Sequence, residues 1–197
     1  MLTKAEKTSR FIVETVAPIF NQKGYAATSL KDLTTATGLT KGAIYGNFES
    51  KEALAVEAFK YNVNTLFKQI SLHQQEASTS LGALYKITDF YRNYYTFSQR
   101  LGGCPILNIG VDANHQDGPL MAQVRKVIDK SQQHIHPLLE LSVKEQALKP
   151  EILHTDFARL MYTRIQGAIF MMQTMEDRSY LVDAADALDK LIRTYEI

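Results

Sequence analysis

The chain has 197 residues, of which 45% are hydrophobic and 22% charged, which suits one or two globular domains and excludes a disordered tail. Its formal net charge is +1, with eight basic and six acidic side chains in residues 1–60, so charge alone does not decide for or against nucleic-acid binding. The N-terminus lacks the apolar stretch of a signal peptide, no apolar run approaches the roughly 20 residues that span a bilayer, and a single cysteine excludes an internal disulfide. We therefore expect a soluble cytoplasmic protein without a membrane partner.

Helical periodicity recurs along the chain and no segment shows the sustained alternation of a strand, so the sequence predicts an all-α protein. Three helices are expected in the N-terminal quarter: serine or threonine begins the second and the third, and glycine ends the first and the second. The first ends at Gly24, the second runs from Thr28 or Ser29 to Gly38, and the third begins at Thr40. We predict that these helices form a small head.

The rest of the chain completes a predicted fold of about nine helices. After the head, the expected helices run from Ser50 through Ile70, then along an aromatic segment that Leu-Gly-Gly (101–103) ends, then from Cys104-Pro105, and then over about residues 118–147, 154–175 and 180–195. We divide the chain into a head, residues 1–50, and a larger helical domain for ligand binding and dimerisation, residues 51–197.

The third expected helix, residues 40–48, has an unusual outer face. Lys41 and Tyr45 lie four residues apart on it, beside Gly42 and Gly46. An interior glycine weakens a helix by about 1 kcal/mol relative to alanine, so a bare face suggests that another surface must come close. The short preceding helix and the glycine turn match helix-turn-helix spacing, in which the second helix enters the DNA major groove. The alternative is that the glycines let this helix pack against a neighbouring helix, with Tyr45 half-buried.

Residues 10–54 resemble the N-terminal domain of the TetR family of transcriptional regulators. The run FNQKGYAATSLKDLTTATGLTKGAIYGNFESKEAL, residues 20–54, contains the family pattern of phenylalanine before G-[YF]-x-x-[TS], glycine at the turn, K-G-x-[IL]-Y-x-x-F and K-E-x-L. The resemblance implies a three-helix DNA-reading head on an all-helical body, most often a homodimeric repressor that leaves a palindromic operator in double-stranded DNA when a small molecule binds. The residues at the family's DNA-contacting positions are Thr28, Thr40, Lys41, Gly42, Tyr45, Asn47 and Lys51. Gly46 departs from the family, in which a larger residue is common there.

The last two expected helices carry wide apolar stripes. Such stripes fit the core of a single chain, whereas the family resemblance implies a bundle of two helices from each subunit of a dimer. The candidate dimer residues are Phe157, Leu160, Met161, Ala168, Met172, Leu181, Leu188, Leu191 and Ile192. A dimer would present two heads to half-sites about 34–36 Å apart.

The middle of the chain is the expected ligand-binding region. Its aromatic residues fit either core or a pocket in which tyrosine hydroxyls orient a hydrophobic or aromatic effector. The segment LGGCPILNIGVDANHQDGPLM, residues 101–121, resembles the core-domain stretch of one TetR subgroup, and some members of that broad group sense electrophiles or oxidants through a cysteine. A cysteine at a helix N-terminus has a lowered thiol pKa, although a buried structural cysteine is the alternative. The candidate ligand-binding residues are Tyr91, Tyr94, Tyr95, Cys104, Asn108 and Asp112.

Two other classes of function are the alternatives to a regulator. An enzyme would use Cys104 as its nucleophile, but the sequence shows no Cys-His pairing, phosphate loop or Gly-x-Ser-x-Gly elbow. The histidines have no spacing typical of a metal site, so we expect neither a metal nor a cofactor. A non-catalytic helical module that binds protein partners, or DNA without sequence specificity, is the alternative to a sequence-specific regulator.

Overall fold

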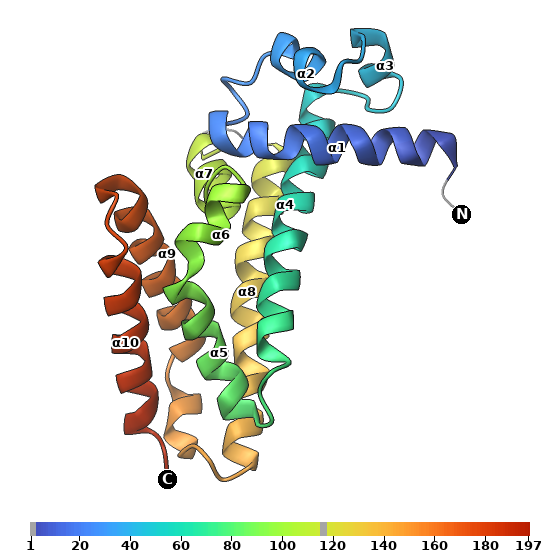
Figure 1. Ribbon diagram of the computed structural model, residues 1–197. Coiled ribbons are helices and arrows are strands. Elements are labelled where there is room, and N and C mark those ends of the chain that lie inside the picture. Colours follow the sequence, from blue (N-terminus) through green and yellow to red (C-terminus); the bar gives the residue numbers. More distant parts are fainter. Residues whose placement is uncertain (1–2, 115–117) are drawn as a thin grey trace. The chain divides into compact units, whose positions relative to one another are not determined.

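The computed structural model describes residues 3–114 and 118–197, and within them it is built from helices (Figure 1). The prediction of an all-α fold is confirmed. Among these residues, no helix is long and apolar enough to cross a membrane. The elements are α1 (Lys4–Lys23), α2 (Leu30–Thr37), α3 (Lys41–Tyr45), α4 (Lys51–Gln74), α5 (Ser80–Arg92), α6 (Tyr94–Arg100), α7 (Pro105–Asp112), α8 (Pro119–Lys144), the 3-10 helix η1 (Pro150–His154), α9 (Phe157–Met175) and α10 (Ser179–Thr194).

The chain forms two compact units. The first comprises residues 1–65 and 98–127, and the second comprises residues 66–97 and 128–197. The first unit therefore takes in α7 as well as the three N-terminal helices. The sequence-based division at residue 50 stays a prediction.

Side-chain caps set the helix boundaries of the head. Ser29 begins α2 with a capping box, in which its hydroxyl accepts from the Asp32 backbone at 3.2 Å and the Asp32 carboxylate accepts from the Ser29 backbone at 2.8 Å. Gly38 ends α2 in the left-handed region, with φ of 67°. Thr40 and Ser50 then cap α3 and α4 as the sequence predicted, through hydrogen bonds from backbone amides three residues later.

The helix α3 is shorter than the sequence predicted, because its last turn is diverted by a side chain. The carboxamide of Asn47 donates to the carbonyl of Ala43 at 2.8 Å, and the backbone N–H of Asn47 bonds instead to the carbonyl of Ile44 at 3.0 Å. A polar side chain that competes for a helix carbonyl ends the regular ladder. Helix α3 therefore stops at Tyr45, and Phe48 lies outside it.

The predicted aromatic helix is two helices. Asn93 leaves the helical region, with φ of −105° and ψ of 8°, so α5 ends there and α6 begins at the next residue. Gly102 and Gly103 then end α6 with φ of 76° and 113°. Gly102 is required for a second reason, since a Cβ atom there would lie 2.7 Å from the carbonyl oxygen of Pro18.

In the second unit, α10 packs against both α9 and α5 (Figure 1). A partly buried charged network reinforces the contact between α5 and α10. Asp189, on α10, accepts from the hydroxyl of Thr88 at 2.6 Å and from the guanidinium of Arg92 at 2.5 Å, and Arg92 also pairs with Asp186 at 2.8 Å. Because each buried oxygen has a donor, the polar groups specify how the two helices align.

Candidate DNA-binding surface and cavity

The head presents a small outward face on α3. Helix α2 packs against both α1 and α3, and Ile44 is fully buried on the inner side of α3. Lys41 and Gly42 are exposed and Tyr45 is half-exposed on the other side, with the Lys41 ammonium 6.0 Å from the centre of the Tyr45 ring. The predicted grouping of these side chains on one face is therefore present in the structure.

Gly42 does not serve packing within the described chain. A Cβ atom placed on it would meet nothing nearer than the Thr40 hydroxyl, at 4.0 Å. A Cβ atom on Gly46, in contrast, would lie 3.2 Å from the carbonyl oxygen of Gly42. The hypothesis that the glycines admit a neighbouring helix therefore fails for Gly42, whose outer side is open.

Two of the predicted DNA-contacting residues have internal partners. The side chain of Thr28 is fully buried, and its hydroxyl donates to the carbonyl of Gly24 at 2.6 Å. Asn47 accepts from the hydroxyl of Ser9 at 2.9 Å while it donates to α3, so it ties α3 to α1. Neither side chain is presented to a bound phosphate in this arrangement.

Lys51 stands at the start of α4, beside the connection between α1 and α2. Its ammonium lies 4.6 Å from the centre of the Tyr25 ring, which is within the range of a cation–π contact. Partial burial lowers the pKa of Lys51, and the carboxylates of Asp112 and Asp32 act in the opposite direction. The contact with Tyr25 thus places the Lys51 ammonium beside the segment that connects α1 to α2.

Two asparagines connect α1 to the segment around α7. The carboxamide of Asn21 is buried and donates to the carbonyls of Leu101 and Gly103 at 2.6 and 2.9 Å. In return, Asn108 on α7 donates to the carbonyl of Asn21 at 2.9 Å. Asn108, a predicted ligand-binding residue, therefore serves the internal structure of the first unit.

Asp112, at the end of α7, also connects α7 to the segment that follows α1. Its carboxylate accepts from the backbone amides of Tyr25 and Ala26 at 2.6 and 3.3 Å. It also fills the space beside Gly24, where a Cβ atom would lie 2.8 Å from a carboxylate oxygen. Residues 24–26 lead into α2, so α7 sets the position from which the helix-turn-helix begins.

Cys104 is nearly fully buried and is the residue before α7, as the sequence predicted. Its side chain makes no capping hydrogen bond to the helix. Among the residues the structure describes, no group of three or more histidine, cysteine, aspartate or glutamate side chains could hold a metal ion.

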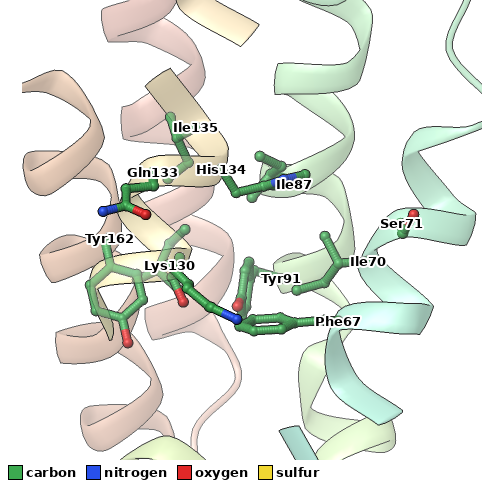
Figure 2. Close-up of a pocket in the computed structure, with 12 residues that line it drawn as sticks. Phe67, Ile70, Ser71, Ile87, Tyr91, Lys130, Gln133, His134, Ile135 and Tyr162 are labelled. Atoms are coloured by element: carbon green, nitrogen blue, oxygen red, sulfur yellow. The ribbon is translucent and has the colours of Figure 1, made fainter. Parts of the chain in front are cut away.

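The second unit contains a cavity of about 460 Å³. This volume falls in the range of about 300–1,000 Å³ typical of small-molecule sites. Its walls come from α4, α5, α8 and α9, and Figure 2 shows their side chains converging from opposite sides. The lining residues are Phe67, Ile70, Ser71, Ile87, Tyr91, Lys130, Ser131, Gln133, His134, Ile135, Tyr162 and Ile165.

Of the six predicted ligand-binding residues, only Tyr91 lines this cavity. Tyr94 is fully buried in an aromatic cluster with Phe90 and Phe97, and the ring of Tyr95 lies 4.2 Å from the guanidinium of Arg178. Cys104, Asn108 and Asp112 belong to the first unit. The ligand-binding role of the other five residues stays a prediction.

The sequence-based set of ligand-binding residues contains none of the cavity-lining residues on α4, α8 and α9. On α8, the segment SQQHI, residues 131–135, has the composition of a solvated helix surface. The one feature that could have indicated a cavity wall there is the polar run that interrupts the apolar stripe of α8. Ile165 has the helical spacing of the apolar stripe of the helix expected over about residues 154–175, and Tyr162 follows Met161 of that stripe. A cavity wall and a core stripe have the same periodicity, so spacing does not distinguish them.

Most candidate dimer residues are core residues of the single chain. Leu160 is 42% exposed and Leu191 is partly exposed. The others are buried: Phe157, Met161, Ala168, Met172, Leu181, Leu188 and Ile192. The stripe faces inward because α9 and α10 pack against each other within the protomer. The dimer face stays a prediction, and these seven side chains are not available to it without rearrangement.

The fold and these surfaces define a class: an all-helical protein with a helix-turn-helix head, an exposed face with Lys41 on α3, and a helical unit that contains a cavity. Comparisons with known proteins identify the family. Residues 12–58 match the model for bacterial regulatory proteins of the tetR family, and residues 80–188 match the model for the Tetracyclin repressor-like C-terminal domain.

Similar proteins agree with both matches. The structure of a TetR-family transcriptional regulator from Cytophaga hutchinsonii is 33% identical, with a TM-score of 0.92, over 100% of this chain and 98% of that one. The HTH-type transcriptional regulator YxaF of Bacillus subtilis is 24% identical over 92% of this chain and 93% of its own length. IcaR of Staphylococcus aureus, the negative transcriptional regulator of the biofilm operon icaADBC, is 26% identical over 48% of this chain and 53% of its own length.

The chain belongs to the TetR family of transcriptional regulators. Members of this family are DNA-binding transcription factors and not enzymes.

Proposed function

We propose that this regulator is a cytoplasmic homodimeric repressor that binds a palindromic operator through α3 of each head and leaves it when a hydrophobic or aromatic small molecule occupies the cavity. The observation that carries the proposal is the open outer face of α3, where Gly42 has no packing role within the described chain. The similarity to the negative regulator of Staphylococcus aureus supports repression.

In the proposed complex, α3 lies in the major groove, which is wide enough to admit a helix. The exposed positions of Lys41 and Tyr45 suit contacts to phosphates on either side, while the backbone at Gly42 approaches the base edges. Lys51 adds a phosphate contact from the start of α4. Thr40 is exposed, and its hydroxyl caps α3 by accepting from the backbone N–H of Ala43, so it fixes the end of the helix that meets the DNA.

The proposed dimer face is the outer side of α9. Leu160, Gly167 and Phe170 are exposed there at helical spacing, and a Cβ atom on Gly167 would meet nothing within 4 Å. A glycine with open space beside exposed apolar side chains allows the backbone of a second helix to approach closely. Two protomers joined in this way would present two heads to the half-sites of a palindrome.

The proposed effector site is the cavity, in preference to Cys104. A thiol that reacts with an electrophile must be reached by it, and Cys104 is nearly fully buried. An electrophile sensor would therefore need an opening of the segment before α7. Equal release of the wild type and Cys104→Ser by an electrophile would support the structural role, whereas loss of release in the variant would assign sensing to the thiol.

The test is binding of the purified protein to DNA fragments from around its own coding region, against scrambled fragments, at several salt concentrations. We expect a tight complex with one fragment and protection of a near-palindrome. Binding that is weak, equal on all fragments and lost with added salt would favour the alternative of a helical module without sequence specificity.

A further inference from the structure

The walls of the cavity differ in polarity. The sides formed by α4, α5 and α9 are mostly apolar, with Phe67, Ile70, Ile87 and Ile165 among their residues. The side formed by α8 supplies Lys130, Ser131, Gln133 and His134, as well as Ile135. The cavity therefore combines an apolar body with one polar wall, which is the arrangement that an amphipathic molecule requires.

The charged side chain of this polar wall is positive, and no negative side chain accompanies it among the lining residues. Lys130 is the only lysine or arginine among the twelve lining residues, and none of the twelve is an aspartate or a glutamate. Its side chain points across the cavity toward Phe67 and Tyr91 (Figure 2). Within residues 3–114 and 118–197, no ion pair links Lys130 to a carboxylate. The cavity thus offers a bound molecule a cation that the described protein does not neutralise.

A second polar group of the wall is held in a fixed orientation. The Gln74 carboxamide donates from Nε2 to the carbonyl of Ala83 at 3.2 Å, which leaves its Oε1 as the acceptor for His134 Nε2 at 2.8 Å. Nε2 of His134 therefore carries the proton of that hydrogen bond. The ring is fixed one helical turn from Lys130, on the same side of α8.

From these features we infer that the cavity selects organic anions, namely carboxylic acids with an apolar body, whose carboxylate meets Lys130 while the body lies against α4, α5 and α9. A cationic molecule would find no carboxylate among the lining residues. An uncharged apolar molecule would place no counter-ion beside the Lys130 ammonium. An acid supplies both a counter-ion and an apolar body. The further step, that such an acid is the effector of the regulator, rests on the proposed function.

The test compares acids with alcohols of the same carbon skeleton. Octanoate with octanol, decanoate with decanol, and 2-naphthoate with 2-naphthalenemethanol are titrated into the full-length wild type by calorimetry. The same titrations are made with Lys130→Met, which keeps most of the apolar stem, and with Lys144→Met as a control, an exposed lysine on α8 that does not line the cavity. Circular dichroism verifies that each variant is folded.

We expect at least one acid to bind more tightly than its alcohol by roughly ten-fold, equivalent to about 1.4 kcal/mol. This preference should be lost in Lys130→Met and kept in Lys144→Met. Binding of no acid, equal binding of acid and alcohol in every pair, or a preference that survives Lys130→Met would each overturn the inference.

Operator binding is measured separately on the same preparations. If the acids bind through Lys130 but no operator is found, the cavity's selectivity stands and the proposed repressor function fails. If an operator is bound and only the alcohols release it, the repressor function stands and the selectivity for anions is wrong.

Discussion

Enlarging Gly42 should separate DNA binding from folding. In the protein alone, a side chain at position 42 points into open space, with Thr40 the nearest contact at 4.0 Å for its Cβ atom. Replacing glycine by alanine or leucine also raises intrinsic helix propensity by up to about 1 kcal/mol per residue. We therefore expect Gly42→Ala and Gly42→Leu to fold at least as stably as the wild type.

The effect on DNA binding follows from the size of the major groove. The groove is about 12 Å wide, and a helix with its side chains measures about 10–12 Å across. A leucine that projects from the face of α3 takes up the remaining clearance and displaces the helix from the base edges. Loss of readout at one base pair weakens binding by about 1–3 kcal/mol. With two heads per dimer, Gly42→Leu should weaken operator binding by at least roughly 30-fold, and Gly42→Ala by less.

Fluorescence anisotropy with labelled operator gives the affinity, and urea denaturation gives the free energy of unfolding. Ala122→Leu is the matched control, since it adds a similar apolar side chain to an exposed helical position outside α3. Operator affinity within three-fold of the wild type in Gly42→Leu would show that this face does not enter the groove. Loss of stability by more than about 1 kcal/mol would show that the open space beside Gly42 is occupied in the native protein.

Three further predictions concern phosphate contacts, the dimer and the effect of pH. Lys51→Ala should weaken binding to all DNA sequences alike and reduce the salt dependence of log K by about 1 for each subunit, as measured by anisotropy titrations at several salt concentrations, with Lys144→Ala as the unaffected control. Gly167→Leu should leave the helical circular dichroism unchanged but shift the dimer to monomer in sedimentation velocity; an unchanged dimer would place the subunit interface elsewhere. Hydrogen bonds from Lys23 and Ser29 hold the pKa of Asp32 below its ordinary value, so its stabilising effect on the head is present above about pH 4 and is lost as pH falls. When the full-length protein is titrated with acid and followed by circular dichroism, the loss of helical signal below about pH 4 should therefore be smaller in Asp32→Asn than in the wild type. Identical titration curves would contradict this assignment.

The helix boundaries of the head could be predicted closely because short-range chemistry sets them. Ser29, Gly38, Thr40 and Ser50 each fix one boundary through a local hydrogen bond or a left-handed backbone conformation. The division of the aromatic segment into α5 and α6 was not predictable in the same way. Asn93 is a weak helix breaker by propensity, and only the surrounding structure decides whether the chain leaves the helix there.

The ligand-binding and dimer residues were less predictable, because an apolar stripe does not say which surface covers it. Met161 and Ile192 face the core of their own chain, whereas Phe170, which was not selected, is 51% exposed on α9. Lys130 and His134 carry the polarity of the cavity, yet in the sequence they belong to a helix face that looks solvated. Only the position of α4, α5 and α9 opposite that face makes them lining residues.

The two glycines of α3, which look alike in the sequence, have different physical explanations. Gly46 lies where a Cβ atom would crowd the carbonyl of Gly42 at 3.2 Å, next to the point where Asn47 ends the helix. A side chain at position 46 would require the neighbouring backbone to shift by a few tenths of an ångström, so glycine relieves a tight contact there. Gly42 has no such internal reason, so its bare surface is the part of the motif that points to a binding partner. For this reason the decisive substitution in the head is at position 42, whereas a substitution of Asn47 reports on the contact between α3 and α1.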